Sequence, residues 1–204
     1  DVKTAPNSAK LNYHYGLELS KKGDEATDPS VKKSFYDKGN LHLQKAIDLY
    51  PTYGDAYGRL GLTYYHTKDY QNALMQYQKS IEYKPNNATI HSNLGTLYFE
   101  LAKTGQGNTT QAQTNIQNAK NSYKKAVSIN PRFVDGWRNM GSLEAQTGNF
   151  TAAIEAFANA LKYQPNDPIL NYYLGSAYLD SGNETAGRPY LEKAYRLKPD
   201  LPRK

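Results

Sequence analysis

Cysteine, long apolar runs and an initiating methionine are all missing from this chain of 204 residues. Without cysteine, disulfide bonds, thiol nucleophiles and cysteine-ligated metal sites are excluded. No stretch approaches the roughly 18 apolar residues that cross a bilayer, so no segment here is expected to span a membrane. The chain opens at Asp1, and we interpret it as a fragment or mature form, so any signal or membrane segment would lie outside it.

Enzyme signatures are also missing. The sequence contains no H-E-x-x-H, no G-x-S-x-G and no G-x-x-x-x-G-K-[ST] motif. The four histidines, His14, His42, His66 and His91, are scattered without ligand spacing. We therefore expect no catalytic residues, no cofactor and no metal, and look for function in a surface.

A period of 34 residues organises the chain. It separates Pro51 from Pro85, Pro131 from Pro165, Pro165 from Pro199, Gly61 from Gly95, and Gly141 from Gly175. Two intervals are longer, because Gly16 to Gly61 is 45 residues (34 + 11) and Gly95 to Gly141 is 46 (34 + 12). Five repeats result, and the first and third carry insertions.

The repeat resembles the tetratricopeptide repeat (TPR) family. Numbering residues 54–87 as positions 1 to 34 matches the signature W-x2-L-G-x2-Y…A-x3-F-x2-A-x4-P at Tyr57, Leu60, Gly61, Tyr64, Ala73, Tyr77, Ser80 and Pro85. The resemblance implies an all-α fold, a right-handed solenoid of five helix–turn–helix repeats, two with elongated B helices. Small residues at positions 8, 20 and 27 would let helices A and B approach closely.

The boundaries follow from this register. We predict an N-terminal linker over residues 1–8, one TPR domain over 9–201 and a tail over 202–204, with repeats at 9–53, 54–87, 88–133, 134–167 and 168–201. In repeat 1, helix A should cover 9–21, residues 23–30 should form a loop, and Asp28 followed by Pro29 should start helix B. In repeat 3, Thr110 should cap helix B after a loop over 104–109. In repeat 5, Pro189 is expected in the first turn of helix B, where the missing N–H is tolerated.

The TPR resemblance implies a concave groove lined by helix A, chiefly at positions 2, 5, 6, 9, 12 and 13, that binds a polypeptide. Our candidate groove residues are Arg59, Tyr65, His66, Asn93, Thr96, Phe99, Arg138, Asn139, Ser142, Tyr172 and Tyr173. Gln146, Ser176 and Asp180 occupy the same set of positions.

The kind of ligand is less constrained. The carboxylate clamp of chaperone-binding TPR domains is not matched, since Gly58, Leu62 and Asp135 stand at positions that it requires. Asn93 and Asn139 match the position-6 asparagines with which the TPR region of O-GlcNAc transferase holds peptide backbone, because an amide both donates and accepts. Exposed asparagines that are merely solvated are an equally open alternative.

The N-terminal segment has a resemblance of its own. Pro6, Ser8, Ala9, Lys10, Tyr13 and Gly16 resemble the junction at which multi-pass, TPR-bearing membrane proteins related to protein O-mannosyltransferases pass into their repeats. The resemblance implies an extracytoplasmic location, periplasmic or otherwise, with the membrane reached only through segments outside this chain. N-x-[ST] sequons at Asn87, Asn108, Asn149 and Asn183 agree with that side or are coincidence, and a cytoplasmic location stays open.

The net charge of +6 is concentrated near the end, where residues 188–204 contain six basic and two acidic side chains. Nucleic acid or an anionic membrane surface is one interpretation. A solvated helix face is favoured, because no aromatic-rich RNA motif or clustered basic helix accompanies the charge. We expect no nucleic-acid partner.

Two functions of different class remain. The leading hypothesis is a non-catalytic interaction module that binds a polypeptide of unknown identity, within a larger membrane-anchored, glycosyltransferase-like protein. The alternative is a structural scaffold that forms a homo-oligomer through an uncapped fifth repeat. That alternative depends on Tyr190, Leu197 and Leu201 being left exposed.

Overall fold

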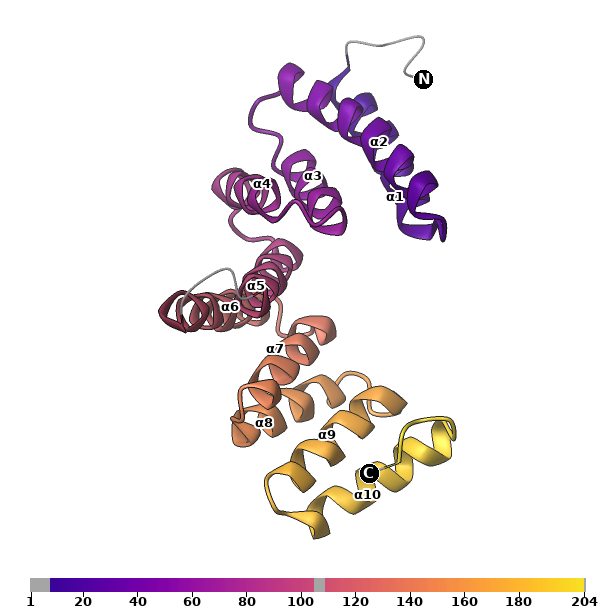
Figure 1. The fold of residues 1–204 in the computed structure, drawn as a ribbon, viewed down its shortest axis with the longest axis vertical. Coiled ribbons are helices and arrows are strands. Elements are labelled where there is room, and N and C mark those ends of the chain that lie inside the picture. Colours follow the sequence, from indigo (N-terminus) through magenta and orange to yellow (C-terminus); the bar gives the residue numbers. More distant parts are fainter. Residues whose placement is uncertain (1–7, 105–108, 204) are drawn as a thin grey trace. The chain divides into compact units, whose positions relative to one another are not determined.

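The computed structural model describes residues 8–104 and 109–203. Over these residues it contains helices and no strand, which confirms the all-α prediction (Figure 1). The helices are α1 (Ala9–Glu25), α2 (Pro29–Leu49), α3 (Gly54–His66), α4 (Tyr70–Tyr83), α5 (Ala88–Lys103), α6 (Thr109–Ile129), α7 (Val134–Gln146), α8 (Phe150–Leu161), α9 (Pro168–Asp180) and α10 (Glu184–Leu197).

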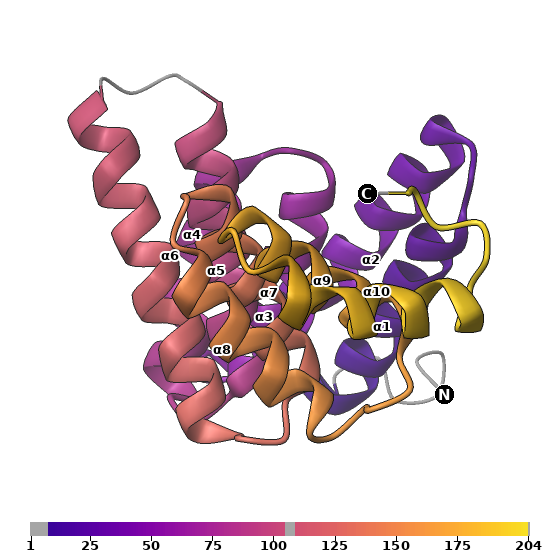
Figure 2. The ribbon, with the colours of Figure 1, turned by 90° about the horizontal axis from the view of Figure 1, so that it is seen from below.

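The chain forms two compact units, Asp1–Leu97 and Tyr98–Lys204, and the division between them falls within the sequence of α5. In the first unit, α1 packs on α2 and α3 on α4; in the second, α7 packs on α8 and α9 on α10, each as an antiparallel pair (Figures 1 and 2). The single domain over 9–201 stays a prediction. The N-terminal linker, apart from Ser8, lies outside the described residues.

Small residues do lie where the paired helices cross. The residues at positions 8, 20 and 27 are buried in every repeat. A Cβ atom added at Gly61 would stand 2.7 Å from the Tyr77 ring, and one at Gly187 would stand 2.7 Å from the carbonyl oxygen of Gly175. At these two glycines the helices approach too closely for a methyl group, and the predicted register is confirmed.

The insertions lengthen both helices of their repeats. Helices α2 and α6 have 21 residues each, against 12 to 14 in α4, α8 and α10, as predicted for the B helices. Helices α1 and α5 are also longer, with 17 and 16 residues against 13 in α3, α7 and α9. The prediction that helix A of repeat 1 covers 9–21 was wrong, because α1 continues to Glu25.

The loop predicted over 23–30 is correspondingly shorter. Gly23 lies inside α1, where its Cβ position is only 2.6 Å from the Tyr36 ring, so here glycine allows packing and does not end the helix. Asp28 caps α2 as predicted, its carboxylate accepting the N–H groups of Ser30 and Val31. Helix α6 begins at Thr109, so Thr110 is not its cap, and the residues before it lie outside the described residues.

The short A–B turns of repeats 2, 4 and 5 share one conformation. Their position-15 residues have positive φ: Lys68 (61°), Gly148 (78°) and Gly182 (84°). The next residue in each turn caps helix B through its side chain: Asp69, Asn149 and Asn183. Asn87 accepts the N–H of Ile90 in the same way at the start of α5, so three of the four sequon asparagines serve as helix caps.

A second repeated contact joins each repeat to the next. The side chain at position 4 meets the carbonyl oxygen of the proline that ends the preceding repeat: Tyr57 with Pro51 (3.1 Å), His91 with Pro85 (2.8 Å), Trp137 with Pro131 (2.8 Å) and Asn171 with Pro165 (3.1 Å). We call these four pairs the inter-repeat bonds. Position 4, an aromatic position in the TPR signature, therefore closes the turn between repeats.

Two local features differ from expectation. Pro189 is the sixth residue of α10, so it lies in the second turn and not the first, and it cannot donate to the carbonyl of Thr185. Glu144 occupies position 11, an aromatic position in the TPR signature, and is buried with 4% exposure. Its carboxylate is 2.7 Å from the Lys120 ammonium and 3.1 Å from the Asn149 amide nitrogen, which offsets the cost of burying it.

Candidate peptide-binding surface on the A helices

In the first unit, the groove candidate Arg59 is already engaged. Its guanidinium lies 2.6 Å from the carboxylate of Asp24, at the end of α1, and only 13% of its side chain is exposed. Asp24 was placed in a loop by the sequence, so this partner was missed. Arg59 is therefore an internal ion-pair member and not a free charge for a ligand.

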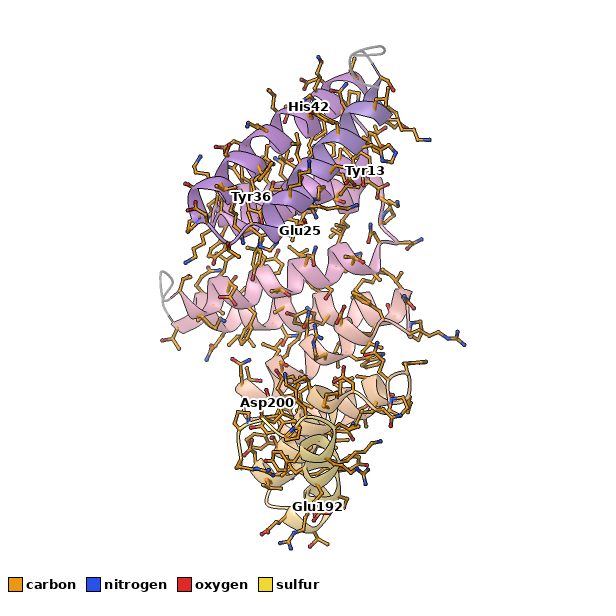
Figure 3. The ribbon with its side chains drawn as sticks, turned by 90° about the vertical axis from the view of Figure 1, so that its right-hand side faces the viewer. Tyr13, Glu25, Tyr36, His42, Glu192 and Asp200 are labelled. Atoms are coloured by element: carbon orange, nitrogen blue, oxygen red, sulfur yellow. The ribbon has the colours of Figure 1, made fainter. Side chains whose placement is uncertain are left out.

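His66 belongs to the same cluster. Its ring stacks on Tyr36 with centroids 5.8 Å apart, and its Nε2 is 3.7 Å from Asp24. Burial lowers the pKa of His66, while Asp24 opposes that shift. Tyr36 donates its hydroxyl to Asp24 over 2.9 Å, and burial, reinforced by this bond, raises the pKa of the Tyr36 phenol. Tyr36 and Glu25 lie towards one end of the α1/α2 pair, and Tyr13 and His42 towards the other (Figure 3).

The remaining candidates of the first unit are half-buried. The Tyr65 ring lies 5.9 Å from that of Tyr70, and Thr96 donates to the carbonyl of Ser92 over 3.2 Å. Asn93, expected to be exposed, stands beside the buried hydroxyl of Tyr77. It acts to lower the pKa of that phenol, against a larger increase from burial, although no hydrogen bond of good geometry reaches the hydroxyl.

In the second unit, Phe99 and Arg138 also have neighbours of their own. Phe99 packs against a core cluster of Ala119, Tyr123 and Leu143, with the Lys103 ammonium 5.0 Å from its ring. Arg138 pairs with Asp135 at 2.8 Å and keeps 40% of its side chain exposed, so its charge is partly compensated. Asn139 is half-buried, contrary to the expectation that it is exposed.

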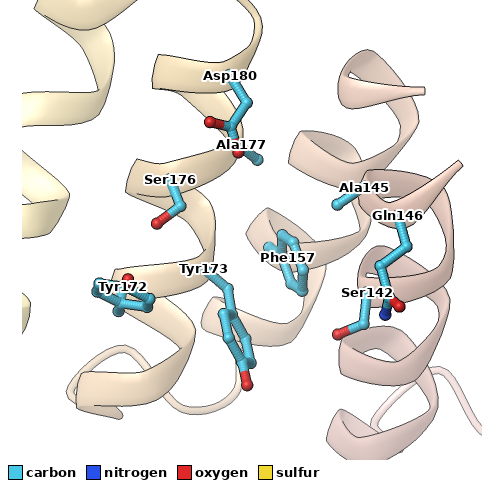
Figure 4. A pocket seen from close by; sticks show the side chains of 9 residues that line it. All are labelled: Ser142, Ala145, Gln146, Phe157, Tyr172, Tyr173, Ser176, Ala177 and Asp180. Carbon is cyan, nitrogen blue, oxygen red and sulfur yellow. The ribbon is translucent and has the colours of Figure 1, made fainter. Parts of the chain in front are cut away.

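The other three candidates of the second unit surround a pocket of about 270 Å³ (Figure 4). Helix α7 contributes Ser142, Ala145 and Gln146, and α9 contributes Tyr172, Tyr173, Ser176, Ala177 and Asp180. Phe157 of α8 forms the apolar floor, its ring 5.4 Å from that of Tyr173. A volume of this order suits one large amino-acid side chain better than a drug-sized ligand.

Two polar groups of α9, the Asp180 carboxylate and the Ser176 hydroxyl, line the otherwise largely apolar part of the pocket. Asp180 is the only carboxylate among the lining residues, and no lysine or arginine lines the pocket. The Ser176 hydroxyl is shielded from solvent, with the residue 8% exposed, and has no hydrogen-bond partner among the described residues. A buried hydroxyl in that state costs free energy unless a bound group satisfies it.

Of the predicted groove residues, Ser142, Tyr172 and Tyr173 are thus brought together, and Gln146, Ser176 and Asp180 join them. Sequence reasoning missed Phe157, because helix B residues are assigned to the core and not to the groove. The candidates Arg59, Tyr65, His66, Asn93 and Thr96 lie in the first unit and the others in the second. A continuous groove, and the holding of one peptide backbone by both Asn93 and Asn139, stay predictions.

A second pocket lies in the first unit, at the start of the elongated α2. Its volume is about 250 Å³, and it is lined by Pro29, Lys32, Lys33, Tyr36, His66 and Thr67.

No group of three or more potential metal ligands occurs in the described part of the chain. None of the described helices is long and apolar enough to cross a bilayer.

Comparison with known proteins identifies the repeat. A family model described as tetratricopeptide repeat matches residues 104–158 and 138–202, another with that description matches 42–75, and a TPR repeat model matches 61–101. The Hsp70-Hsp90 organizing protein of Triticum aestivum is 24% identical over 174 residues, which are 83% of this chain and 27% of that protein. Protein O-mannosyl-transferase TMTC1 of Homo sapiens is 27% identical over 116 residues, 57% of this chain and 12% of that protein.

The fold is found among solved structures as well. YrrB, described as "a TPR protein with an unusual peptide-binding site", superimposes with a TM-score of 0.69 at 19% identity, covering 98% of this chain and 91% of YrrB. The chain itself spans about a quarter or less of the two curated relatives above. Repeat spacing, helix pairing, buried small residues and family models agree, and the chain belongs to the tetratricopeptide repeat family.

Proposed function

We propose that this chain is a non-catalytic interaction module that binds a polypeptide on the A-helix face of its repeats. The observation that carries the proposal is the pocket between α7 and α9, where an apolar floor is surrounded by a few polar groups. Concave sites of this composition bind ligands, and A-helix faces receive peptides in this fold. The description of YrrB as having a peptide-binding site supports the same class of ligand.

Selection from a phage library of random dodecapeptides tests the proposal. Ser142→Phe places a ring over the pocket from α7, and Thr151→Phe adds the same ring at an exposed position of α8 as a matched control. Peptides enriched on the wild type should bind Thr151→Phe equally and lose binding to Ser142→Phe. Absence of enrichment, or peptides that bind Ser142→Phe undiminished, would contradict a peptide site here.

We also propose that the module is the extracytoplasmic part of a longer, membrane-anchored protein. The support is the N-terminal segment and the similarity to the O-mannosyl-transferase TMTC1. Sequencing the gene upstream of the codon for Asp1 tests it. Several apolar segments of roughly 20 residues would agree with the proposal, and a cytosolic domain in their place would contradict it.

Self-assembly through repeat 5 is a weaker candidate. Leu197 is 44% exposed, but Leu201 is only half-exposed, and Tyr190 is half-buried, stacked on Tyr178 with centroids 5.9 Å apart. The exposed apolar surface is therefore smaller than predicted. Sedimentation equilibrium of wild type and Leu197→Glu tests it: a dimer that the substitution dissociates supports the scaffold, and a monomer at high concentration contradicts it.

A further inference from the structure

The pocket at the start of α2 is built from a stretch of helix that the regular repeats lack. The short B helices all begin at position 17 of their repeats, at Tyr70, Phe150 and Glu184. Counted from Gly39 at position 20, position 17 of repeat 1 is Tyr36, yet α2 begins seven residues earlier (29 against 36), at Pro29. Pro29, Lys32 and Lys33 line the pocket, which we call the α2 pocket, and they have no counterpart in repeats 2, 4 and 5.

The two lysines of this extra stretch give the α2 pocket its charge. Of the lining residues, Lys32, Lys33 and His66 are basic and none is acidic. Lys33 forms an ion pair with Asp37 at 2.7 Å, in which both side chains are more than half exposed. Lys32 is half-buried and forms no ion pair within the described ranges of the chain. The ammonium group of Lys32 is therefore a positive charge that the fold leaves uncompensated.

The carboxylates around the α2 pocket already have other partners. Asp24 lies 2.6 Å from the guanidinium of Arg59 and accepts the Tyr36 hydroxyl over 2.9 Å. Asp28 caps α2 and accepts backbone N–H groups of its first turn, while Asp37 holds the other lysine. These contacts occupy the acidic groups and the backbone donors at the start of α2. A ligand anion would therefore meet the side-chain ammonium groups and not the end of the helix.

The insertion of repeat 3 shows that an elongated helix does not need these lysines. Helix α6 has the same length as α2, and when the two are aligned at position 20 they start at equivalent residues, Thr109 and Pro29. Ala112 and Gln113 stand at the places of the two lysines. A B helix of 21 residues thus forms with neutral side chains there. The lysines are not a requirement of the longer helix, which favours a role for them in the pocket.

The remaining walls of the α2 pocket suit the stem of one side chain. The Tyr36 and His66 rings stack with centroids 5.8 Å apart, and Pro29 adds further apolar surface. Thr67 donates its hydroxyl to backbone carbonyls of α3, so the lysines and the histidine are the groups left to donate to a ligand. A volume of about 250 Å³ lies below the range of sites for drug-sized molecules.

Resting on the proposed function, we propose that the α2 pocket binds an acidic side chain of the polypeptide partner, glutamate in preference to its neutral amide glutamine. The carboxylate accepts hydrogen bonds from Lys32, with Lys33 and His66 beside it. The methylene stem lies against the Tyr36 ring. The insertion of repeat 1 thereby adds to the first unit a contact for the partner that regular repeats do not offer.

The histidine in the wall makes this binding depend on pH. Burial lowers the pKa of His66, Asp24 of α1 opposes that shift, and Arg59 of α3 and Lys32 of α2 reinforce it. A carboxylate bound beside Lys32 would offset the positive charge and raise the pKa of His66. Binding would therefore take up protons, so the affinity for an acidic ligand should rise as pH falls through the pKa of His66.

Nuclear magnetic resonance titration with Nα-acetyl-glutamate amide tests the proposal, with Nα-acetyl-glutamine amide as the neutral probe of nearly equal shape. Backbone resonances around Lys32 and Thr67 should shift with glutamate amide and saturate. Glutamine amide should bind about two- to fivefold more weakly, because it cannot form the ion pair. Equal binding of the two probes, or shifts confined to other surfaces, would overturn the proposal.

Substitution of the uncompensated lysine tests its role. Lys32→Ala should reduce the affinity for glutamate amide to the level of glutamine amide. The variant is expected to fold, because alanine stands at the equivalent place in α6. Lys38→Ala, which removes an exposed lysine of α2 that does not line the α2 pocket, should leave the affinity unchanged. Undiminished binding to Lys32→Ala would overturn the assignment.

The pH dependence gives a readout that a purely structural histidine would not give. Between about pH 7.5 and about pH 5.5 glutamate amide stays ionised, since its pKa is about 4.3. The affinity of the wild type should rise over this range, and His66→Asn should remove the rise. The same rise in His66→Asn, or constant affinity in the wild type, would overturn the contribution of His66.

The peptide library separates this inference from the proposed function. Selected peptides that contain glutamate or aspartate and lose binding to Lys32→Ala support both. Peptides without acidic residues that need Ser142 and bind Lys32→Ala undiminished overturn the acidic site and leave the peptide-binding function standing. If glutamate amide binds beside Lys32 while no peptide is enriched, the peptide-binding function is contradicted and the carboxylate site stands.

Discussion

At the scale of single residues, Lys68 stands where its equivalents are glycines. Its φ of 61° matches the left-handed turn residues Gly148 and Gly182 in repeats 4 and 5. A residue with a Cβ is destabilised by about 1–2 kcal/mol in this conformation. Glycine avoids that strain, but part of the gain is offset because glycine has more conformational freedom in the unfolded chain. We expect Lys68→Gly to stabilise the protein by about 0.5–1 kcal/mol, measured by urea denaturation. Lys68→Ala, which keeps the Cβ, is the control and should bring no such gain.

The ion pair of Lys120 and Glu144 is a second residue-scale feature. The Glu144 side chain is 5% exposed, and removing Lys120 would leave its carboxylate buried with only the Asn149 amide beside it. Lys120→Met should therefore cost about 3–5 kcal/mol, whereas Lys120→Met with Glu144→Leu should restore most of the loss.

Denaturation midpoints of the two single variants and the double variant form the required cycle. If the double variant were as unstable as Lys120→Met alone, the packing of the lysine stem, and not the unpaired charge, would account for the loss.

At the scale of helices, we expect the usual preference for alanine over glycine in a helix interior to be reversed where α9 and α10 cross. Alanine normally stabilises a helix interior by roughly 0.8–1 kcal/mol over glycine, and it is the signature residue at position 20. At Gly187, however, a Cβ would stand 2.7 Å from the Gly175 carbonyl oxygen and 2.5 Å from Leu179. Because a backbone atom cannot move aside, Gly187→Ala should destabilise by about 1–3 kcal/mol.

Thr185→Ala, exposed in the first turn of α10, is the control for helix propensity and should be neutral or stabilising. The thermal unfolding midpoints of the two variants, compared with that of the wild type, test this prediction. A stabilised Gly187→Ala would mean that the two helices can separate without loss of packing elsewhere.

The helices also show how far the sequence could predict this structure. Proline and glycine spacing determined the register, because those residues occupy turns and crossings that admit little else. The same logic failed at Gly23, where a glycine beneath the Tyr36 ring was taken for a loop residue. Spacing alone does not tell a packing glycine from a helix-ending one.

The candidate site was predictable to a smaller extent. The repeat positions of Ser142, Tyr172 and Tyr173 predicted that all three lie on the groove face of the A helices, because the helical period fixes the side on which each residue lies. They could not reveal that Arg59 turns to Asp24, because that contact depends on where α1 ends. Nor could they supply Phe157, which reaches the pocket from a neighbouring helix. Face membership follows from sequence, whereas side-chain partners depend on tertiary packing.

At the scale of the whole molecule, acid should weaken the fold through its histidines. Burial lowers the pKa of both His66 and His42 in the folded protein. Below the unfolded value of about 6.5, the unfolded chain therefore binds more protons than the folded one. The stabilisation is complete above that value and is lost as pH falls through the folded pKa values.

Urea midpoints at pH 7.5, 6.5 and 5.5 should therefore fall with pH, and the fall should be smaller for a variant with His66→Asn and His42→Asn. The same slope in the double variant would assign the acid sensitivity to other groups.

The inter-repeat bonds also bear on how the chain folds while it is being synthesised. Each joins a proline carbonyl to a donor only six residues later, such as Pro131 to Trp137. Such a contact closes as soon as the first turn of the next A helix has left the ribosome, without waiting for distant sequence. Chains with mainly local contacts fold quickly, and repeat arrays can propagate structure from one unit to the next. Synthesis at about 5–20 residues per second would then complete each repeat within seconds, so that little apolar surface stays open to aggregation while the rest is translated.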